Sequence, residues 1–237
     1  YDKKKLELSL KGNILIKDRE QNIEIEANKI KYFKDREEII TYGNSVINIE
    51  DNYSIYSSDI NFSRTKGTIS SLKKTIIDDK YDNKFKSTEF VYFISEKLIK
   101  AKKVEITDNQ GNISKLNNFF GGLNDKEYFG KDIKIDFNNN TFGNSENEPR
   151  LYGNTVSSNQ NISKISKGVF TTCKKREKCP PWKISAGEVT HDKNKKIINY
   201  KNAWLSVYDK PVIYFPKFFH PDPTVKRQSG FLVPGIS

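Results

Sequence analysis

The residues best suited to chemistry in this 237-residue sequence are two cysteines and two histidines. Cys173 and Cys179 enclose five residues, whereas zinc ligand pairs usually enclose two to four and occur with a second pair. His191 and His220 are isolated in the sequence. A Cys–His nucleophile also needs a third group to orient it, and none is recognisable nearby. The sequence therefore indicates neither a metal centre nor a nucleophilic site.

Other signatures of catalysis and of nucleic-acid binding are missing from the sequence. It has no glycine-rich phosphate loop before a helix, no HExxH and no GxSxG. The net charge of +11 could attract anionic partners, but the lysines are scattered and lack the aromatic stacking platform of an RNA-binding module. We therefore expect a protein that is not an enzyme and has no cofactor. A basic nucleic-acid binder, recognisable by steep salt dependence, is one alternative.

The first hundred residues repeat with a period of thirty. Ala27-Asn-Lys-Ile30, Ser57-Ser-Asp-Ile60 and Ser87-Thr-Glu-Phe90 each place a small residue three positions before an apolar one. A second set of turn-like signals begins at Gly12, Gly43 and Lys73, which completes each repeat. A fixed period of this size is typical of stacked units that bury their apolar faces against one another.

Within each repeat, apolar and polar residues alternate with a period of two. Ile23-Glu-Ile-Glu and Ile133-Lys-Ile-Asp-Phe show this pattern, and Gly-Asn and Asp-Asn pairs separate such segments. No segment has the periodicity of an amphipathic helix, and no run of about eighteen apolar residues occurs. The pattern predicts an all-β chain of short half-buried strands, arranged as an elongated two-sheet structure with an apolar seam.

The C-terminal stretch is rich in proline, which forbids a long helix and restricts strands to edges or ends. It contains Pro211-Val-Ile-Tyr-Phe-Pro216, a Pro-Asp pair, and then Arg227-Gln-Ser-Gly-Phe-Leu-Val-Pro234. This order and spacing resemble the junction in the LptD family of outer-membrane lipopolysaccharide assembly proteins. The thirty-residue repeats resemble the OstA-like domain of that family and of the LptA and LptC proteins, which is an elongated twisted β-jellyroll.

The resemblance implies a division of the chain into two parts. Residues 1–208 would form the OstA-like domain, and residues 209–237 would form the junction and the start of the first strand of a β-barrel that lies outside this chain. The junction residues implied in this way are Pro216, Pro221, Arg227, Gly230, Phe231 and Pro234.

The resemblance also implies a function at the outer membrane, on its periplasmic side, in a Gram-negative bacterium. The domain would receive lipopolysaccharide from an LptA-type bridge protein and pass the acyl chains along an apolar groove to the barrel, where an LptE-type lipoprotein binds. The alternative is a stand-alone lipopolysaccharide bridge or a carbohydrate-binding β-solenoid. Alternation alone does not distinguish an open groove from a packed core. A packed core is the default for a two-sheet protein, and only the resemblance makes the groove an equal alternative. The residues expected to line the interior are Ile23, Ile25, Ile30, Tyr32, Ile47, Ile49, Ile60, Phe62, Phe90 and Tyr92.

Two further expectations concern the cysteines and the first strand. The resemblance places Cys173 in a Thr-Thr-Cys element that the family bridges to cysteines beyond the barrel. Cys179 departs from that pattern, so a local Cys173–Cys179 disulfide is an alternative, and it predicts no free thiol in the isolated chain. The segment Leu6–Ile16 is expected to be a sheet edge that docks the bridge protein by strand addition, so Ile14→Pro should weaken that binding.

Overall fold

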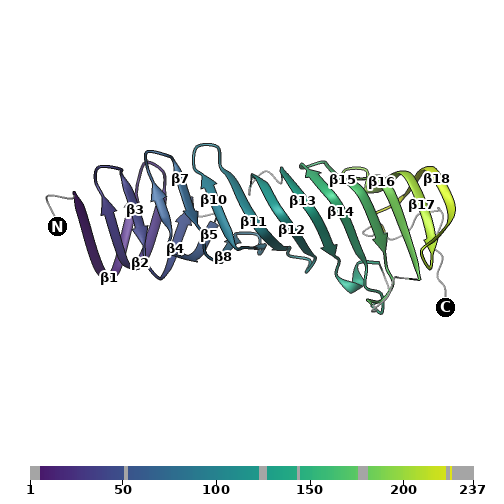
Figure 1. Ribbon diagram of the computed structural model, residues 1–237, viewed down its shortest axis with the longest axis horizontal. Coiled ribbons are helices and arrows are strands. Elements are labelled where there is room, and N and C mark those ends of the chain that lie inside the picture. Colours follow the sequence, from purple (N-terminus) through teal and green to yellow (C-terminus); the bar gives the residue numbers. More distant parts are fainter. Residues whose placement is uncertain are drawn as a thin grey trace. The chain divides into compact units, whose positions relative to one another are not determined.

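The structure is a computed structural model that describes residues 6–50, 53–122, 127–142, 145–175, 181–222 and 225 (Figure 1). Within these residues it contains eighteen β-strands, one short 3-10 helix, η1 (Asn139–Phe142), and no α-helix. The predicted all-β class is therefore confirmed. The chain divides into two compact units, one of Tyr1–Gln110 and Ser114–Leu123 and the other of Gly111–Ile113 and Asn124–Ser237. Each unit is described by itself.

The first unit is built from twelve strands, most of them short. They are β1 (Glu7–Asp18), β2 (Ile23–Phe33), β3 (Glu38–Thr41), β4 (Asn44–Ile49), β5 (Tyr53–Ser58), β6 (Asn61–Ser63), β7 (Thr68–Ser71), β8 (Thr75–Asp79), β9 (Lys84–Ser87), β10 (Glu89–Phe93), β11 (Leu98–Thr107) and β12 (Ile113–Gly122).

Two long strands, β2 and β11, frame two half-sheets in this unit. The second half of β2 pairs with β3, and its first half pairs with β4. Half-sheet 1 then continues through β6, β7 and β10, and half-sheet 2 continues through β5, β8 and β9. Both series end on β11, whose two halves pair with β10 and β9. All these pairings are antiparallel, and Figure 1 shows β7 and β10 on one side of the unit and β4, β5 and β8 on the other. The arrangement agrees with the predicted β-jellyroll.

The inward face of each half-sheet carries a continuous row of apolar side chains. Residues paired directly across neighbouring antiparallel strands share a face, so the thirty-residue period places equivalent residues in the same row. The row on half-sheet 1 is Tyr32, Ile39, Phe62, Ile69, Tyr92 and Ile99, and the row on half-sheet 2 is Ile25, Ile47, Ile55, Ile77, Phe85 and Ile106. Most of these side chains are buried, and each contributes about 2 kcal/mol through the hydrophobic effect.

Hydroxyl side chains mark the corner where the chain crosses from one half-sheet to the other. Ladder hydrogen bonds stop at this corner, so other partners must satisfy the backbone. The amide of Ile60 donates to Oγ1 of Thr41 at 3.0 Å, and Oγ1 of Thr75 lies 2.8 Å from Oγ of Ser57. Ser71 Oγ donates to the carbonyl of Ser58 at 2.8 Å. The small residues that define the repeat in the sequence therefore occupy the corner.

The second unit is made of six long strands that pair in sequence order. They are β13 (Tyr128–Asp136), β14 (Arg150–Ser158), β15 (Ile162–Thr171), β16 (Trp182–Asp192), β17 (Ile197–Val207) and β18 (Lys210–Pro221). Three of them contain a residue in the left-handed region at mid-strand: Asp132 (φ 55°), Lys167 (φ 49°) and Asn202 (φ 52°). The pairing skips these positions. Each strand therefore bends without being broken in two.

Small residues on the inward side accompany these bends. Gly153, Gly168, Ala186 and Ala203 lie on consecutive strands near the skipped positions. A Cβ atom on Gly153 would lie 2.2 Å from Cγ2 of Ile165, and one on Gly168 would lie 2.4 Å from Cγ2 of Val189. Glycine is therefore required at both positions, because any larger residue would overlap a packed branched side chain.

Strand β18 contains Pro211, Pro216 and Pro221 and, among the described strands, pairs only with β17. This edge position agrees with the expectation drawn from its prolines. Pro216 lies opposite Asn202, at the mid-strand bend where a ladder bond is already missing. Tyr208 and Asp209, both with positive φ, form a two-residue hairpin turn between the strands. The predicted domain boundary after residue 208 falls within this turn, and the division itself stays a prediction.

Candidate functional site

The first unit contains a cleft at the end nearest β1, with an apolar wall and charged residues around its mouth. The cleft has a volume of about 410 Å³, and its walls include Ile16, Tyr32, Ile39 and Phe62. Tyr32, Ile39 and Phe62 are direct register partners on β2, β3 and β6, so they form one wall from half-sheet 1. Ile16 comes from the part of β1 that pairs with the half-sheet 2 end of β2. The cleft therefore lies between the inward faces of the two half-sheets.

Charged residues surround the mouth of this cleft. Asp18 and Glu20 lie at the end of β1, and Arg64 lies in the turn after β6. The Arg64 guanidinium hydrogen-bonds the Glu20 carboxylate and lies 3.9 Å from Asp18, and the Glu20 bond, followed by the charges, raises the pKa of Arg64 above its usual value. The side chains of Arg64 and Glu20 are exposed, so water screens their attraction and this pair contributes little to stability, whereas the Asp18 side chain is only 12% exposed. The mouth can therefore widen at small cost.

The cleft does not continue as an open channel through the unit. Beyond Phe62, which is 4% exposed, the same row continues with Ile69, Tyr92 and Ile99, all of them buried. Burial, followed by the charge of Glu50, raises the pKa of Tyr92 to about 12, so its hydroxyl stays neutral at physiological pH. The interior is therefore accessible at the β1 end and packed farther along.

The residues predicted to line the interior all face it. Nine are buried and Tyr32 is half-buried; the buried ones are Ile23, Ile25, Ile30, Ile47, Ile49, Ile60, Phe62, Phe90 and Tyr92. Only Tyr32 and Phe62 from the predicted set line the cleft. Whether any of the ten contacts a lipid stays a prediction.

Sequence reasoning missed the charged residues at the mouth of the cleft and two apolar residues in its walls, Ile16 and Ile39. Ile39 could have been found, because it precedes Ile69 and Ile99 by one and two periods of thirty residues. Ile16 lacks such a signal, since its strand contains an irregularity between Lys11 and Ile14 where Gly12 has a φ of 110°.

Strand β1 forms an incompletely covered end of the unit. It spans both halves of β2, and its partner among the described strands is β2. Leu10, which pairs with the inward-facing Ile30, is 40% exposed. The expected edge strand is therefore present, and docking of a bridge protein at this edge stays a prediction.

Of the two cysteines, Cys173 is half-buried just after β15, and its Sγ lies 3.7 Å from the carbonyl oxygen of Trp182. The Arg150 guanidinium hydrogen-bonds the carbonyl oxygen of Cys173 and that of Glu148. Cys179 lies outside the described residues, so the Cys173–Cys179 disulfide stays a prediction.

Both histidines lie at one end of the second unit, where β16, β17 and β18 meet. His191 Nε2 lies 2.6 Å from a carboxylate oxygen of Asp222. His220 Nε2 lies 3.0 Å from the hydroxyl of Tyr200, and its Nδ1 lies 2.7 Å from the carbonyl of Pro221. Burial lowers the pKa of His220. Within the described residues, no group of three or more His, Cys, Asp and Glu side chains is arranged to hold a metal ion.

The predicted junction is described in part. Pro216 and Pro221 lie in β18, which exposes Val212, Tyr214 and Phe219. The other four predicted junction residues, Arg227, Gly230, Phe231 and Pro234, lie outside the described residues. Among the helices described, none has the length and apolar character needed to span a membrane.

Comparison with known proteins gives a partial match. A stretch of 55 residues is 41% identical to the LPS-assembly protein LptD of Francisella tularensis subsp. novicida (strain U112). The protein of the same name from Francisella tularensis subsp. holarctica (strain OSU18) is 40% identical over 55 residues. Each match covers 23% of this chain and 6% of the relative, so the aligned stretch is a small part of those proteins. No family model matches the chain. Over less than a quarter of its length, the chain is thus similar to proteins of lipopolysaccharide assembly.

Proposed function

We propose that this chain takes part in lipopolysaccharide assembly on the periplasmic side of the outer membrane, as a carrier of acyl chains without catalytic activity. The observation that carries the proposal is the cleft of about 410 Å³ between the half-sheets, with Tyr32 and Phe62 in its apolar wall. An acyl chain gains free energy when it leaves water for such a surface, and no covalent chemistry is needed. The partial similarity to LptD proteins supports lipopolysaccharide as the cargo.

Entry would occur at the β1 end, where the apolar interior is accessible. The weak ion pairs of Arg64 with Asp18 and Glu20 would part as the acyl chains enter. An LptA-type bridge protein would add a strand to β1 and extend the apolar interior toward its own, which fits the exposure of Leu10.

Onward passage would follow the rows of inward side chains. These rows repeat the same apolar types every thirty residues, so a chain moving along them would meet a similar surface at each step. Ile69 and Ile99 fill the interior, so the half-sheets would have to separate as lipid advances. The family resemblance supports delivery to an outer-membrane barrel with its LptE-type lipoprotein.

Two matched aspartate substitutions test this function. Phe62 lies at the cleft, and Ile69, its direct partner on β7, lies in the packed part of the same row. We expect Phe62→Asp to abolish binding of fluorescent lipopolysaccharide while the purified chain still folds, because water at the mouth partly hydrates the carboxylate. Ile69→Asp should unfold the unit, since a fully buried carboxylate has no partner there.

Ser70→Asp provides the control for charge. Ser70 is half-buried on the outward face of β7, next in sequence to Ile69. The Ser70→Asp substitution should change neither lipopolysaccharide binding nor the melting temperature substantially. If Phe62→Asp binds lipopolysaccharide as tightly as the unsubstituted chain, the cleft does not receive acyl chains.

A further inference from the structure

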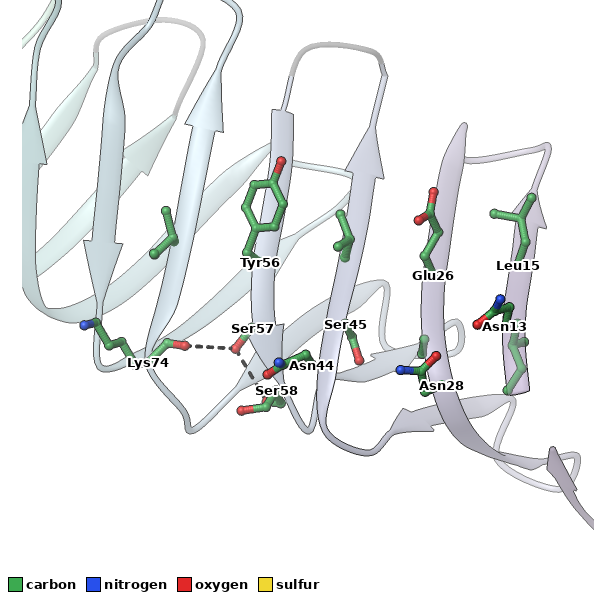
Figure 2. Close-up of a pocket in the computed structure, with 14 residues that line it drawn as sticks. Asn13, Leu15, Glu26, Asn28, Asn44, Ser45, Tyr56, Ser57, Ser58 and Lys74 are labelled. Atoms are coloured by element: carbon green, nitrogen blue, oxygen red, sulfur yellow. Dashed lines mark hydrogen bonds between the residues drawn. The ribbon is translucent and has the colours of Figure 1, made fainter. Parts of the chain in front are cut away.

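A second hollow crosses the outward face of half-sheet 2, on the side of the strands opposite the apolar interior. It has a volume of about 680 Å³, and β1, β2, β4, β5 and β8 all contribute to it (Figure 2). We call it the outer trough. Its floor residues alternate along each strand with those that face the interior. The buried corner residues Ala27, Ser45 and Ser57 also line it.

The floor of the outer trough is a cross-strand row of mostly apolar side chains. Leu15, Glu26, Val46, Tyr56 and Ile76 are direct register partners on the five strands. Leu15 is 53% exposed and Tyr56 is 43% exposed. An aromatic ring is therefore presented to solvent in the middle of a shallow apolar strip.

One side of the trough is lined by amides. Figure 2 shows Asn13, Asn28 and Asn44 along one side of the row formed by Leu15, Glu26 and Tyr56. The three asparagines come from β1, β2 and β4, which are neighbours in the sheet, so successive amides are spaced by about 5 Å. Ser58 and Lys74 continue the same side toward β8.

Ser45 and Ser57 in the lining form hydrogen bonds within the chain, but five other polar side chains of the outer trough have no partners within the described part of the chain. No described group hydrogen-bonds the side chains of Asn13, Asn28 or Asn44, the carboxylate of Glu26 or the hydroxyl of Tyr56. The neighbouring outward surface is different. There Lys86 and Lys115 both lie within 3.1 Å of Glu105, and Lys17 pairs with Glu24. The trough thus collects free donors and acceptors in a surface where charged side chains otherwise pair.

The chemistry of the lining selects among ligands. Glu26 and Lys74 are the charged lining residues and they cancel, whereas a polyanion requires several cations. An acyl chain would leave the three amides without hydrogen bonds, which is unfavourable. A saccharide has apolar C–H faces that can stack on Tyr56 and hydroxyls that can exchange hydrogen bonds with asparagine amides.

We propose that the outer trough binds a neutral saccharide chain lying across the strands, and that this chain is the saccharide part of lipopolysaccharide. The assignment of this saccharide to lipopolysaccharide rests on the proposed function. The binding of a saccharide is inferred from the residues that line the outer trough. Tyr56 would form the stacking surface, and Asn13, Asn28 and Asn44 would bind successive sugar hydroxyls. The trough is a second binding surface, separate from the acyl-chain cleft.

Titration of the full chain with delipidated oligosaccharide, released from lipopolysaccharide by mild acid, tests this proposal. Isothermal calorimetry and NMR chemical-shift mapping should show saturable binding at the trough. Tyr56→Ala should weaken it by about tenfold, since one aromatic anchor often dominates a small interface. Asn28→Ala with Asn44→Ala should also weaken it. Lys100→Ala, exposed on β11 and remote from the trough residues in sequence and register, should bind like the unsubstituted chain.

As a control, the melting curves of these variants should match that of the unsubstituted chain, because the substituted residues are exposed. Absence of saturable binding, equal affinity in all variants, or shifts confined to other residues would overturn the proposal. Saturable binding of a bridge-protein peptide at the trough, with no binding of the oligosaccharide, would instead assign the surface to protein docking and overturn it as well. Phe62→Asp changes the cleft and not the trough. Its affinity for the oligosaccharide therefore reports on the trough alone, and its affinity for lipopolysaccharide reports on the acyl-chain cleft. The two proposals can fail separately.

Discussion

The sheets of both units are bent, and the chain must pass from one half of each sheet to the other. The two units differ in how the chain passes this bend. Between β2 and β11 of the first unit the chain breaks into short strands, and hydroxyls such as Thr41 and Thr75 satisfy the backbone at the corner. In the second unit the strands stay continuous, and three of them bend over a left-handed residue, with Gly153 and Gly168 permitting close approach of their neighbours. The first corner therefore depends on hydrogen bonds, and the second depends on the absence of side chains.

The largest expected effect comes from filling the bend of the second unit. Gly153→Ala would place a Cβ atom 2.2 Å from Cγ2 of Ile165, a branched side chain that cannot turn away. We expect a loss of about 1–3 kcal/mol in the free energy of unfolding, the usual cost of overpacking. Urea denaturation of the purified chain, followed by circular dichroism, measures it.

Gly187→Ala is the matched control for this substitution. Gly187 lies at a skipped position of β16, but a Cβ atom there would meet its nearest neighbour at an ordinary 3.6 Å. The free energy of unfolding of the Gly187→Ala variant should therefore differ little from that of the unsubstituted chain. If Gly153→Ala and Gly187→Ala behave alike, close approach is not what shapes the second corner.

The next effect concerns the hydroxyl corner of the first unit. Thr75→Val keeps the shape of the side chain but removes its contacts with Ser57 Oγ at 2.8 Å and the Lys73 carbonyl at 3.0 Å. Leaving buried partners unsatisfied should cost about 1–3 kcal/mol. The same denaturation measurement applies.

Ser87→Ala sharpens this prediction, because the buried Ser87 hydroxyl has no hydrogen-bond partner within the described structure. Its loss should leave stability unchanged or slightly raised. A cost for Ser87→Ala as large as that for Thr75→Val would show that size, rather than hydrogen bonding, matters at the corner.

The smallest effect is a pH dependence confined to the second unit. Burial is the largest cause of the lowered pKa of His220, partly offset by its bond to Pro221 and the charge of Asp222; His191 lowers it further. The folded state therefore binds the proton less readily than the unfolded state. Stability should be full above about pH 6.5. It should fall as the pH drops from there through the lowered pKa.

Denaturation midpoints at pH 7.5 and 5.5 test this dependence. His220→Phe, which retains the aromatic packing against Tyr200 and Phe218, should lose less stability on acidification than the unsubstituted chain. An identical loss in both proteins would assign the pH dependence to other groups.

The sequence alone predicted the first unit better than the second, for a physical reason. In the first unit the chain passes from one half-sheet to the other and back every thirty residues. Tyr32, Phe62 and Tyr92 therefore recur at a fixed interval and reveal the inward face. In the second unit, bends at Asp132, Lys167 and Asn202 shift the alternation by one residue within each strand, so the period is obscured.

Two features of the sites could not be predicted in this way. Tyr32 and Tyr92 are equivalent in the repeat, yet one lines the cleft and the other is packed. That difference depends on which strands cover them, which a local pattern does not record. The outer trough depends on the free amides of Asn13, Asn28 and Asn44, and in an asparagine-rich chain these do not stand out.

The central claim is that acyl chains enter the interior between the half-sheets, and site-specific photo-crosslinking in lipopolysaccharide-transporting cells tests it most directly. The crosslinker would replace Tyr32 or Phe62 in the cleft wall, or, as outward controls, Lys31 or Ser70 on the same strands or their neighbours. The account predicts lipopolysaccharide adducts from Tyr32 and Phe62 and none from Lys31 and Ser70. Adducts from neither cleft position, in variants that remain folded, would contradict it and leave the interior as a packed core.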